Sequence, residues 1–188
     1  IYSPKRQPAS RPAATAKKDA CEMDGREARL ESLGHWIPGQ LSYRLPEGSA
    51  RLLPANSSIL MKIRYRKNSW EAADRSQIGL YFAKGPVNKT VRAIVIEPKE
   101  TTIPAGSDLY RVKASRVING PAEAIAIRPL LFPFARSVEA TAYRPDGTAE
   151  VLIWAKSYRF DWQPSYYFKK PISLPKGTRL EITAYIDN

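Results

Sequence analysis

The chain has 188 residues, of which 43% are hydrophobic, and its formal net charge at pH 7 is +12. That hydrophobic content excludes a wholly disordered chain, and no stretch reaches the roughly 18 continuous apolar residues that a membrane-spanning helix needs. Sixteen prolines and ten tyrosines, together with many β-branched residues, favour strands separated by turns. We therefore expect an all-β protein with little helix.

Residues 1–20 have the composition of a flexible basic tail or linker. Three prolines spaced four residues apart interrupt any regular element, and Ala, Ser and Lys fill the gaps. The alternative is an arm that wraps around a partner subunit. The cations of this segment that we take as candidates for binding a partner are Lys5, Arg6, Lys17 and Lys18. Cys21 is the single cysteine and cannot form an internal disulfide, so we expect a free thiol or a partner in another chain.

Two turns, Trp36–Gly39 and Leu45–Gly48, precede an apolar run that predicts a strand over Ile59–Tyr65. Further strands are predicted at 74–82, 91–96, 110–114, 122–128, 137–143, 149–155, 166–169 and 179–186. Turns are predicted at three places among the later strands. These turns are Asn119-Gly120, Pro145–Gly147 and Pro175–Gly177. Short strands at this spacing predict a β-sandwich with Greek-key or jelly-roll connections, and we expect an antiparallel sandwich of jelly-roll type.

Three motifs near the end of the chain carry a family resemblance. They are Trp162–Tyr166, Leu174–Thr178 and the closing Tyr185–Asn188. In this order they resemble the C-terminal domain of the copper type II, ascorbate-dependent monooxygenases, in the bacterial branch of that family. Residues 21–74, with their two turns and strand, resemble the end of the family's N-terminal domain. The resemblance implies three regions, 1–20, 21–74 and 75–188, and a periplasmic or otherwise exported protein.

The positions of the copper ligands hold other residues in this chain. In the family, one copper takes a histidine where Arg64 stands, and the other takes a His-x-His pair that aligns with Leu130 and Phe132. A third ligand is a methionine beyond the Asp–Asn motif. Because a guanidinium and hydrocarbon side chains offer no lone pair to a metal, we expect the copper cofactor to be lost and assign no catalytic or metal-binding residue. The one histidine, His35, lies in a turn, where a surface or hydrogen-bonding role is expected.

Two structural outcomes are open for the former ligand pair. Leu130 and Phe132 either fill the site as hydrophobic core or form a contact surface for a partner, together with Phe134. Bases and aromatics alternate over 156–162, as on surfaces that bind single-stranded nucleic acid. The family resemblance favours packing of these aromatics inside the sandwich instead.

We therefore expect a non-catalytic, exported structural or binding subunit of a larger protein assembly. Its partners would be other protein subunits with an acidic or apolar face, nucleic acid is not expected, and any membrane contact would be peripheral. The first alternative is a part of a copper- and ascorbate-dependent monooxygenase whose ligands come from elsewhere. The second is a basic module that binds polyanions or nucleic acid, driven by the net charge of +12.

Overall fold

A computed structural model describes residues 32–65, 73–99 and 102–188. The chain divides into two compact units, Ile1–Ser32 and Leu33–Asn188, and nearly all described residues belong to the second. Every regular element among the described residues is a strand. This part of the chain contains no helix capable of crossing a membrane. The predicted all-β class is therefore confirmed.

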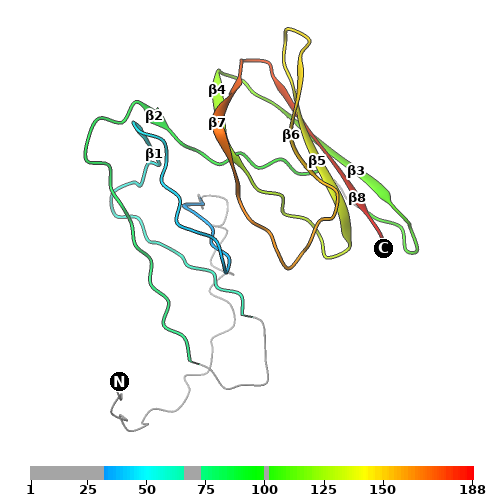
Figure 1. Ribbon diagram of the computed structural model, residues 1–188, viewed down its shortest axis with the longest axis horizontal. Helices are drawn as coiled ribbons and strands as arrows, with labels where there is room; N and C mark the ends of the chain where they lie inside the picture. The colour runs from blue at the N-terminus through cyan, green and yellow to red at the C-terminus, as the bar shows by residue number, and fades with distance from the viewer. Residues whose placement is uncertain (1–31, 66–72, 100–101) are drawn as a thin grey trace. The chain divides into compact units, whose positions relative to one another are not determined.

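Among the described residues, eight strands form three sheets (Figure 1). Their bounds are β1 Ser49–Ala50, β2 Lys89–Thr90, β3 Tyr110–Val117, β4 Ala122–Ile127, β5 Ala135–Tyr143, β6 Ala149–Ala155, β7 Tyr166–Leu174 and β8 Arg179–Ile186. The largest sheet has the order β3-β8-β5-β6, and β4 pairs with β7; all of these pairs are antiparallel. The parallel pair of β1 and β2 spans two residues of each strand.

One hydrophobic cluster receives side chains from the four-stranded sheet and from the sheet of β4 and β7. Its buried members are Ile118, Ala142 and Leu174. Partly buried residues pack against them from β4, β6, β7 and β8, namely Ala122, Ala124, Leu152, Ile172 and Leu180. Alternate residues of a strand point to the same face of its sheet, which explains the spacing of two between cluster members on β4 and on β7. The other apolar residues that are buried in the described part of the chain lie on β5 and β8, namely Ala135, Val138, Ala140, Ala184 and Ile186.

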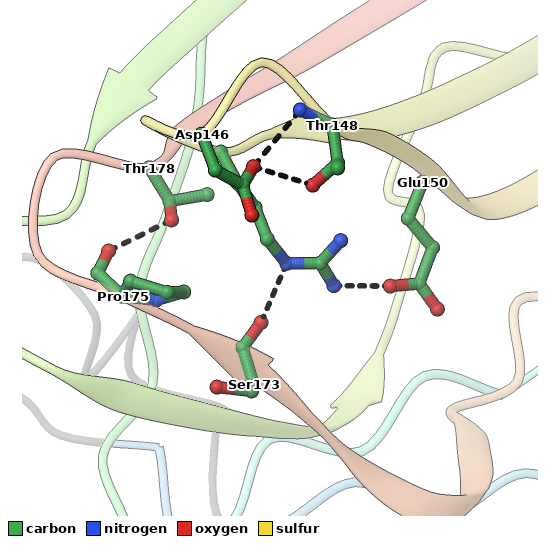
Figure 2. Close-up of polar contacts among 7 residues, drawn as sticks. Asp146, Thr148, Glu150, Ser173, Pro175 and Thr178 are labelled. Atoms are coloured by element: carbon green, nitrogen blue, oxygen red, sulfur yellow. Dashed lines mark hydrogen bonds and ion pairs between the residues drawn. The ribbon is translucent and has the colours of Figure 1, made fainter.

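The two turns predicted at Pro145–Gly147 and Pro175–Gly177 are present and are closed by side chains. The Oδ1 atom of Asp146 accepts hydrogen bonds from the backbone N–H and the hydroxyl of Thr148, at 2.9 and 2.6 Å (Figure 2). The fully buried Thr178 donates its hydroxyl proton to the carbonyl oxygen of Pro175 at 2.7 Å (Figure 2). These local bonds satisfy backbone groups that the strand ladders leave free.

Arg144 connects the two larger sheets. It follows β5, and its Nε donates to the carbonyl oxygen of Ser173 on β7 at 3.1 Å. Its guanidinium also forms an ion pair with Glu150 on β6. Because the guanidinium is planar and carries five donors, one side chain can bond to both sheets at once.

Three predicted strands are wrong as assigned. Residues 59–65, 74–82 and 91–96 lie outside every ladder. Within 33–99, none of the described residues is fully buried. The apolar and β-branched residues of these runs favour an extended backbone, but a strand also needs a neighbouring edge with which to pair. In the described part of the chain, only β1 and β2 provide such a pairing for this region.

Candidate functional site

The loop between β4 and β5 presents three large apolar side chains to solvent. Leu130, Phe132 and Phe134 are exposed by 56%, 57% and 63%, and we call them the apolar crest. The crest contains both positions that the family resemblance aligned with a His-x-His pair. Of the two outcomes left open by the sequence, burial as core is therefore wrong, and these side chains form a surface.

The backbone of this loop is held by hydrogen bonds to its neighbours. The N–H of Leu131 donates to the phenol oxygen of Tyr158 at 3.0 Å, and the N–H of Ala135 donates to the carbonyl of Phe132 at 3.1 Å. Burial raises the pKa of the Tyr158 phenol, which keeps the group protonated. Pro129 and Pro133 restrict φ within the loop, so the crest is presented on a constrained backbone.

An open hollow of about 380 Å³ lies beside the crest. It is lined by Pro133, Phe134, Ala135, Arg136, Lys156, Ser157, Tyr158 and Asp187. Arg136 stands at a β-bulge in the pairing of β5 with β8, and its guanidinium forms an ion pair with Asp187. The ammonium of Lys156 lies 4.3 Å from the centre of the Trp154 ring, a cation–π contact. The hollow thus joins an apolar surface to the Arg136–Asp187 ion pair and to the ammonium of Lys156.

The segment 156–162 departs from the packing that the sequence predicted. Phe160 and Trp162 are exposed, and only Tyr158 is half-buried. The guanidinium of Arg159 pairs with the carboxylate of Asp161 through two hydrogen bonds, at 3.0 and 2.8 Å. The prediction that the aromatics of this segment pack inside the sandwich is therefore wrong for Phe160 and Trp162.

The turn at Trp36–Gly39 lies against the motif that begins at Trp162. A Cβ atom on Gly39 would lie 3.5 Å from the Trp162 ring. Tyr43 lies four residues after Gly39, and its ring stacks on the ring of Tyr167 with centroids 3.5 Å apart and an interplanar angle of 17°. Sequence reasoning identified both motifs but missed this stacking pair, since nothing in the spacing of two tyrosines 124 positions apart indicates contact.

His35 belongs to the same contact region. Burial, followed by the positive charge of Arg128, lowers the pKa of its imidazole below the ordinary value of 6.5. A backbone hydrogen bond with Gln163 acts in the opposite direction. The neutral imidazole is therefore favoured near neutral pH, in keeping with the hydrogen-bonding role expected for this histidine.

The residues that the sequence singled out as former ligands are not gathered into one described centre. Leu130 and Phe132 share the crest, whereas Arg64 lies in the extended segment before residue 66 and makes no ion pair with a described residue. Among the residues with described positions, no group of three His, Cys, Asp or Glu side chains could hold a metal ion. The tail candidates Lys5, Arg6, Lys17 and Lys18 lie outside the described residues.

No protein-family model, curated protein or solved structure matches this chain. The site consists of an exposed apolar crest and a hollow that is lined by the Arg136–Asp187 ion pair, the ammonium of Lys156 and a half-buried phenol. Such a surface can bind a protein through apolar contact and charge complementarity.

Proposed function

We propose that this chain is a non-catalytic subunit that docks onto a partner protein through the apolar crest. The scaffold in this proposal is a β-sandwich of jelly-roll type, related to the copper monooxygenases and exported as they are. The observation that carries the proposal is the exposure of all three crest side chains, each by more than half, on a loop that two prolines constrain. A crest of this kind costs little conformational entropy to bury.

The energetics favour the crest as the centre of an interface. Full burial of one large apolar side chain contributes roughly 1.5–3 kcal/mol, and interface energy concentrates on a few aromatic and apolar anchors. Phe132 and Phe134 are therefore suited to be anchors, with Leu130 beside them. The cost of ordering a loop on binding is reduced where the backbone is already held.

The charges beside the crest indicate the chemistry of the partner. Arg136, Lys156 and Asp187 line the adjacent hollow, and because Arg136 is paired with Asp187, Lys156 leaves the hollow with a net positive charge. The whole chain carries a net charge of +12. Acidic groups around an apolar patch on the partner would complement this arrangement and steer the encounter.

The exposed apolar residues of the segment 33–99 also support a subunit of a larger assembly. Leu41 and Tyr81 are almost fully exposed, and Trp36 and Phe82 are largely so. Exposed apolar surface of this extent commonly marks an interaction site. A partner that covers this segment would supply the burial that the segment lacks on its own.

The test compares affinity-tagged variants produced in the native host. Phe132→Glu and Phe134→Glu place a carboxylate in the crest and are expected to abolish co-purification of a protein that the wild type retains in fixed ratio. Val117→Glu, a change of the same kind at an exposed position on β3, away from the crest and from the segment 33–99, is the matched control and is expected to retain the partner. Equal recovery of the same partner with all three variants would contradict the proposal.

The high net charge supports a second candidate, binding to a polyanion. Lysines and arginines that contact phosphates release counterions, so affinity for nucleic acid would fall steeply with salt. Affinity for a random-sequence single strand, measured between about 50 and 200 mM NaCl, separates the two candidates. A steep loss would favour the polyanion binder, and weak or salt-insensitive binding would exclude it.

A further inference from the structure

The rings of Tyr43 and Tyr167 form the one stacked aromatic pair among the described residues. Their centroids are 3.5 Å apart and their planes differ by 17°. Most aromatic pairs in proteins keep their centroids about 4.5–7 Å apart, whereas about 3.5–4.0 Å is the distance of direct contact between carbon atoms. The two phenol rings therefore lie face to face in contact, and the ring carbons of each can reach the other without a large movement of either segment.

Contacts on both sides of Tyr43 hold its ring against its partner on β7. Before it, the turn at Gly39 lies against the ring of Trp162, 3.5 Å from the position of a Cβ atom on that glycine. After it, β1 pairs with β2, from which Lys89 forms a salt bridge of 2.6 Å with Glu123 of β4. The segment is thus anchored to the sheet of β4 and β7 before and after the tyrosine, and the two rings are oriented in advance for a reaction between them.

Both phenols can be reached from solvent. Tyr43 is exposed by 40% and Tyr167 by 39%. Burial, and then the neighbouring Tyr167, raise the pKa of the Tyr43 phenol above its ordinary value of 10.0. The group is therefore protonated at neutral pH, and the loss of an electron from its ring must be accompanied by the loss of a proton. Water at the exposed part of the side chain can take that proton.

We propose that Tyr43 and Tyr167 are a site of oxidative cross-linking, at which a haem peroxidase acting with hydrogen peroxide joins the two rings as dityrosine. Each phenol gives one electron to the oxidant and one proton to water. The two phenoxyl radicals then form a carbon–carbon bond between the ring positions next to their oxygens. The hydrogen atoms on those two carbons move to the oxygens and restore both phenols. The pair loses two hydrogen atoms in all, and hydrogen peroxide is reduced to water.

The cross-link would join two parts of the chain that are 124 positions apart. A bond that closes a long loop removes conformational freedom from the unfolded chain, and the effect grows with loop length. The same bond would fix the segment 33–65, in which no residue is fully buried, to β7. Cross-linking is therefore expected to stabilise the part of the described chain that has the least burial of its own.

The first experiment oxidises the full chain at low protein concentration with a peroxidase and hydrogen peroxide, with Cys21→Ser to remove the competing thiol. After trypsin digestion, mass spectrometry is expected to find residues 30–44 linked to residues 160–169, at the summed mass of the two peptides less two hydrogen atoms. Fragmentation should place the bond between Tyr43 and Tyr167. Because the bond forms within one chain, the oxidised protein should keep the size of one chain, 21.1 kDa.

Phenylalanine substitutions are the controls, because they keep the aromatic ring and remove the phenol that is oxidised. Tyr43→Phe and Tyr167→Phe should each abolish the linked peptides. Tyr166→Phe, at the neighbouring position with 42% exposure, should leave their yield unchanged. Tyr81 is exposed by 92% and has no stacked partner among the described residues. It should form no cross-link of comparable yield, which separates contact from accessibility.

The second experiment measures what the bond does to the fold. In urea, the oxidised chain is expected to unfold at a higher midpoint concentration than the untreated chain. Tyr43→Phe, treated with the oxidant in the same way, is expected to show no such rise, and it accounts for oxidation of other side chains. An equal rise in oxidised Tyr43→Phe would contradict stabilisation by this cross-link.

Absence of the linked peptides, under conditions that convert free tyrosine to dityrosine, would overturn the proposal. Links from Tyr43 or Tyr167 to other tyrosines in equal yield would overturn it as well, since ring contact would then not select the pair. The crest takes no part in this chemistry, so Phe132→Glu should cross-link normally. A chain that docks through the crest but forms no cross-link would contradict this inference and leave the proposed function intact.

Discussion

At the scale of single residues, His35 links stability to pH. Its pKa in the folded chain is lowered, first by burial and then by Arg128. A histidine with a depressed pKa stabilises the fold fully above its unfolded value of 6.5, and this contribution is lost as the pH falls through the folded pKa.

We therefore expect the free energy of unfolding to decrease as the pH falls through 6.5 and toward the lower folded-state pKa, and His35→Gln to flatten this part of the profile. Urea unfolding of both proteins across the range is the measurement. An identical slope for wild type and His35→Gln would show that this imidazole does not contribute.

Gly177 is a second residue whose role can be tested. Its φ of +88° lies in the left-handed region, and a Cβ atom would lie 3.2 Å from Cγ of Pro145. Gly177→Ala should destabilise the fold by about 1–2 kcal/mol from backbone conformation alone, with further cost from crowding.

Gly120→Ala is the matched control for this substitution, because a Cβ there meets no atom within 4 Å and its φ is not in the left-handed region. Chemical denaturation of both variants is the measurement. A loss at Gly120 equal to that at Gly177 would contradict the geometric argument.

The sequence could single out Leu130 and Phe132, but it could not predict whether their side chains are buried or exposed. The family resemblance directed attention to Leu130 and Phe132, because it aligned them with a His-x-His pair. Whether an apolar side chain on a loop is buried depends on what packs over it, and no local pattern contains that information. In the structure, the side chains of Leu130 and Phe132 are both more than half exposed.

At the scale of elements, Asp187 joins the end of β8 to a distant loop. Its Oδ1 accepts the backbone N–H of Leu109 at 2.8 Å, and its carboxylate pairs with Arg136. These contacts, the backbone bond first, lower the pKa of Asp187. Leu109 has a φ of +50°, which is unfavourable for leucine, so the bond from Asp187 helps to hold a strained residue.

Asp187→Ala should therefore loosen the loop before β3 and speed hydrogen exchange at the Leu109 amide. Asp108→Ala removes a neighbouring exposed carboxylate and is expected to leave that exchange rate unchanged. The measurement is amide exchange by mass spectrometry or NMR. Equal protection of Leu109 in both variants would contradict the assigned role.

Six of the predicted strands, from β3 to β8, are confirmed, whereas the earlier ones are not. Predicted turns connect β3 to β4, β5 to β6 and β7 to β8, and each confirmed strand pairs with at least one other. The run at Ile59–Tyr65 has the same propensity but no described strand beside it. Propensity could predict an extended backbone there, but pairing depends on tertiary context.

At the scale of the whole molecule, burial is distributed unevenly. All residues that are fully buried in the described part of the chain lie between Ile118 and Ile186. The described residues of 33–65 and 73–99 contribute extended backbone and exposed apolar side chains but no buried residue. This distribution is expected of a subunit that is completed by another protein.

We propose that the chain serves as a binding subunit and not as a copper enzyme. The most direct test is to purify it under mild conditions from its native host and to measure copper content, ascorbate-driven oxygen consumption and co-purifying proteins together. We predict no retained copper, no ascorbate-driven oxygen consumption and one protein partner in fixed ratio. One or two copper atoms per chain, with ascorbate-driven oxygen consumption, would contradict the account and indicate that another chain completes the metal sites.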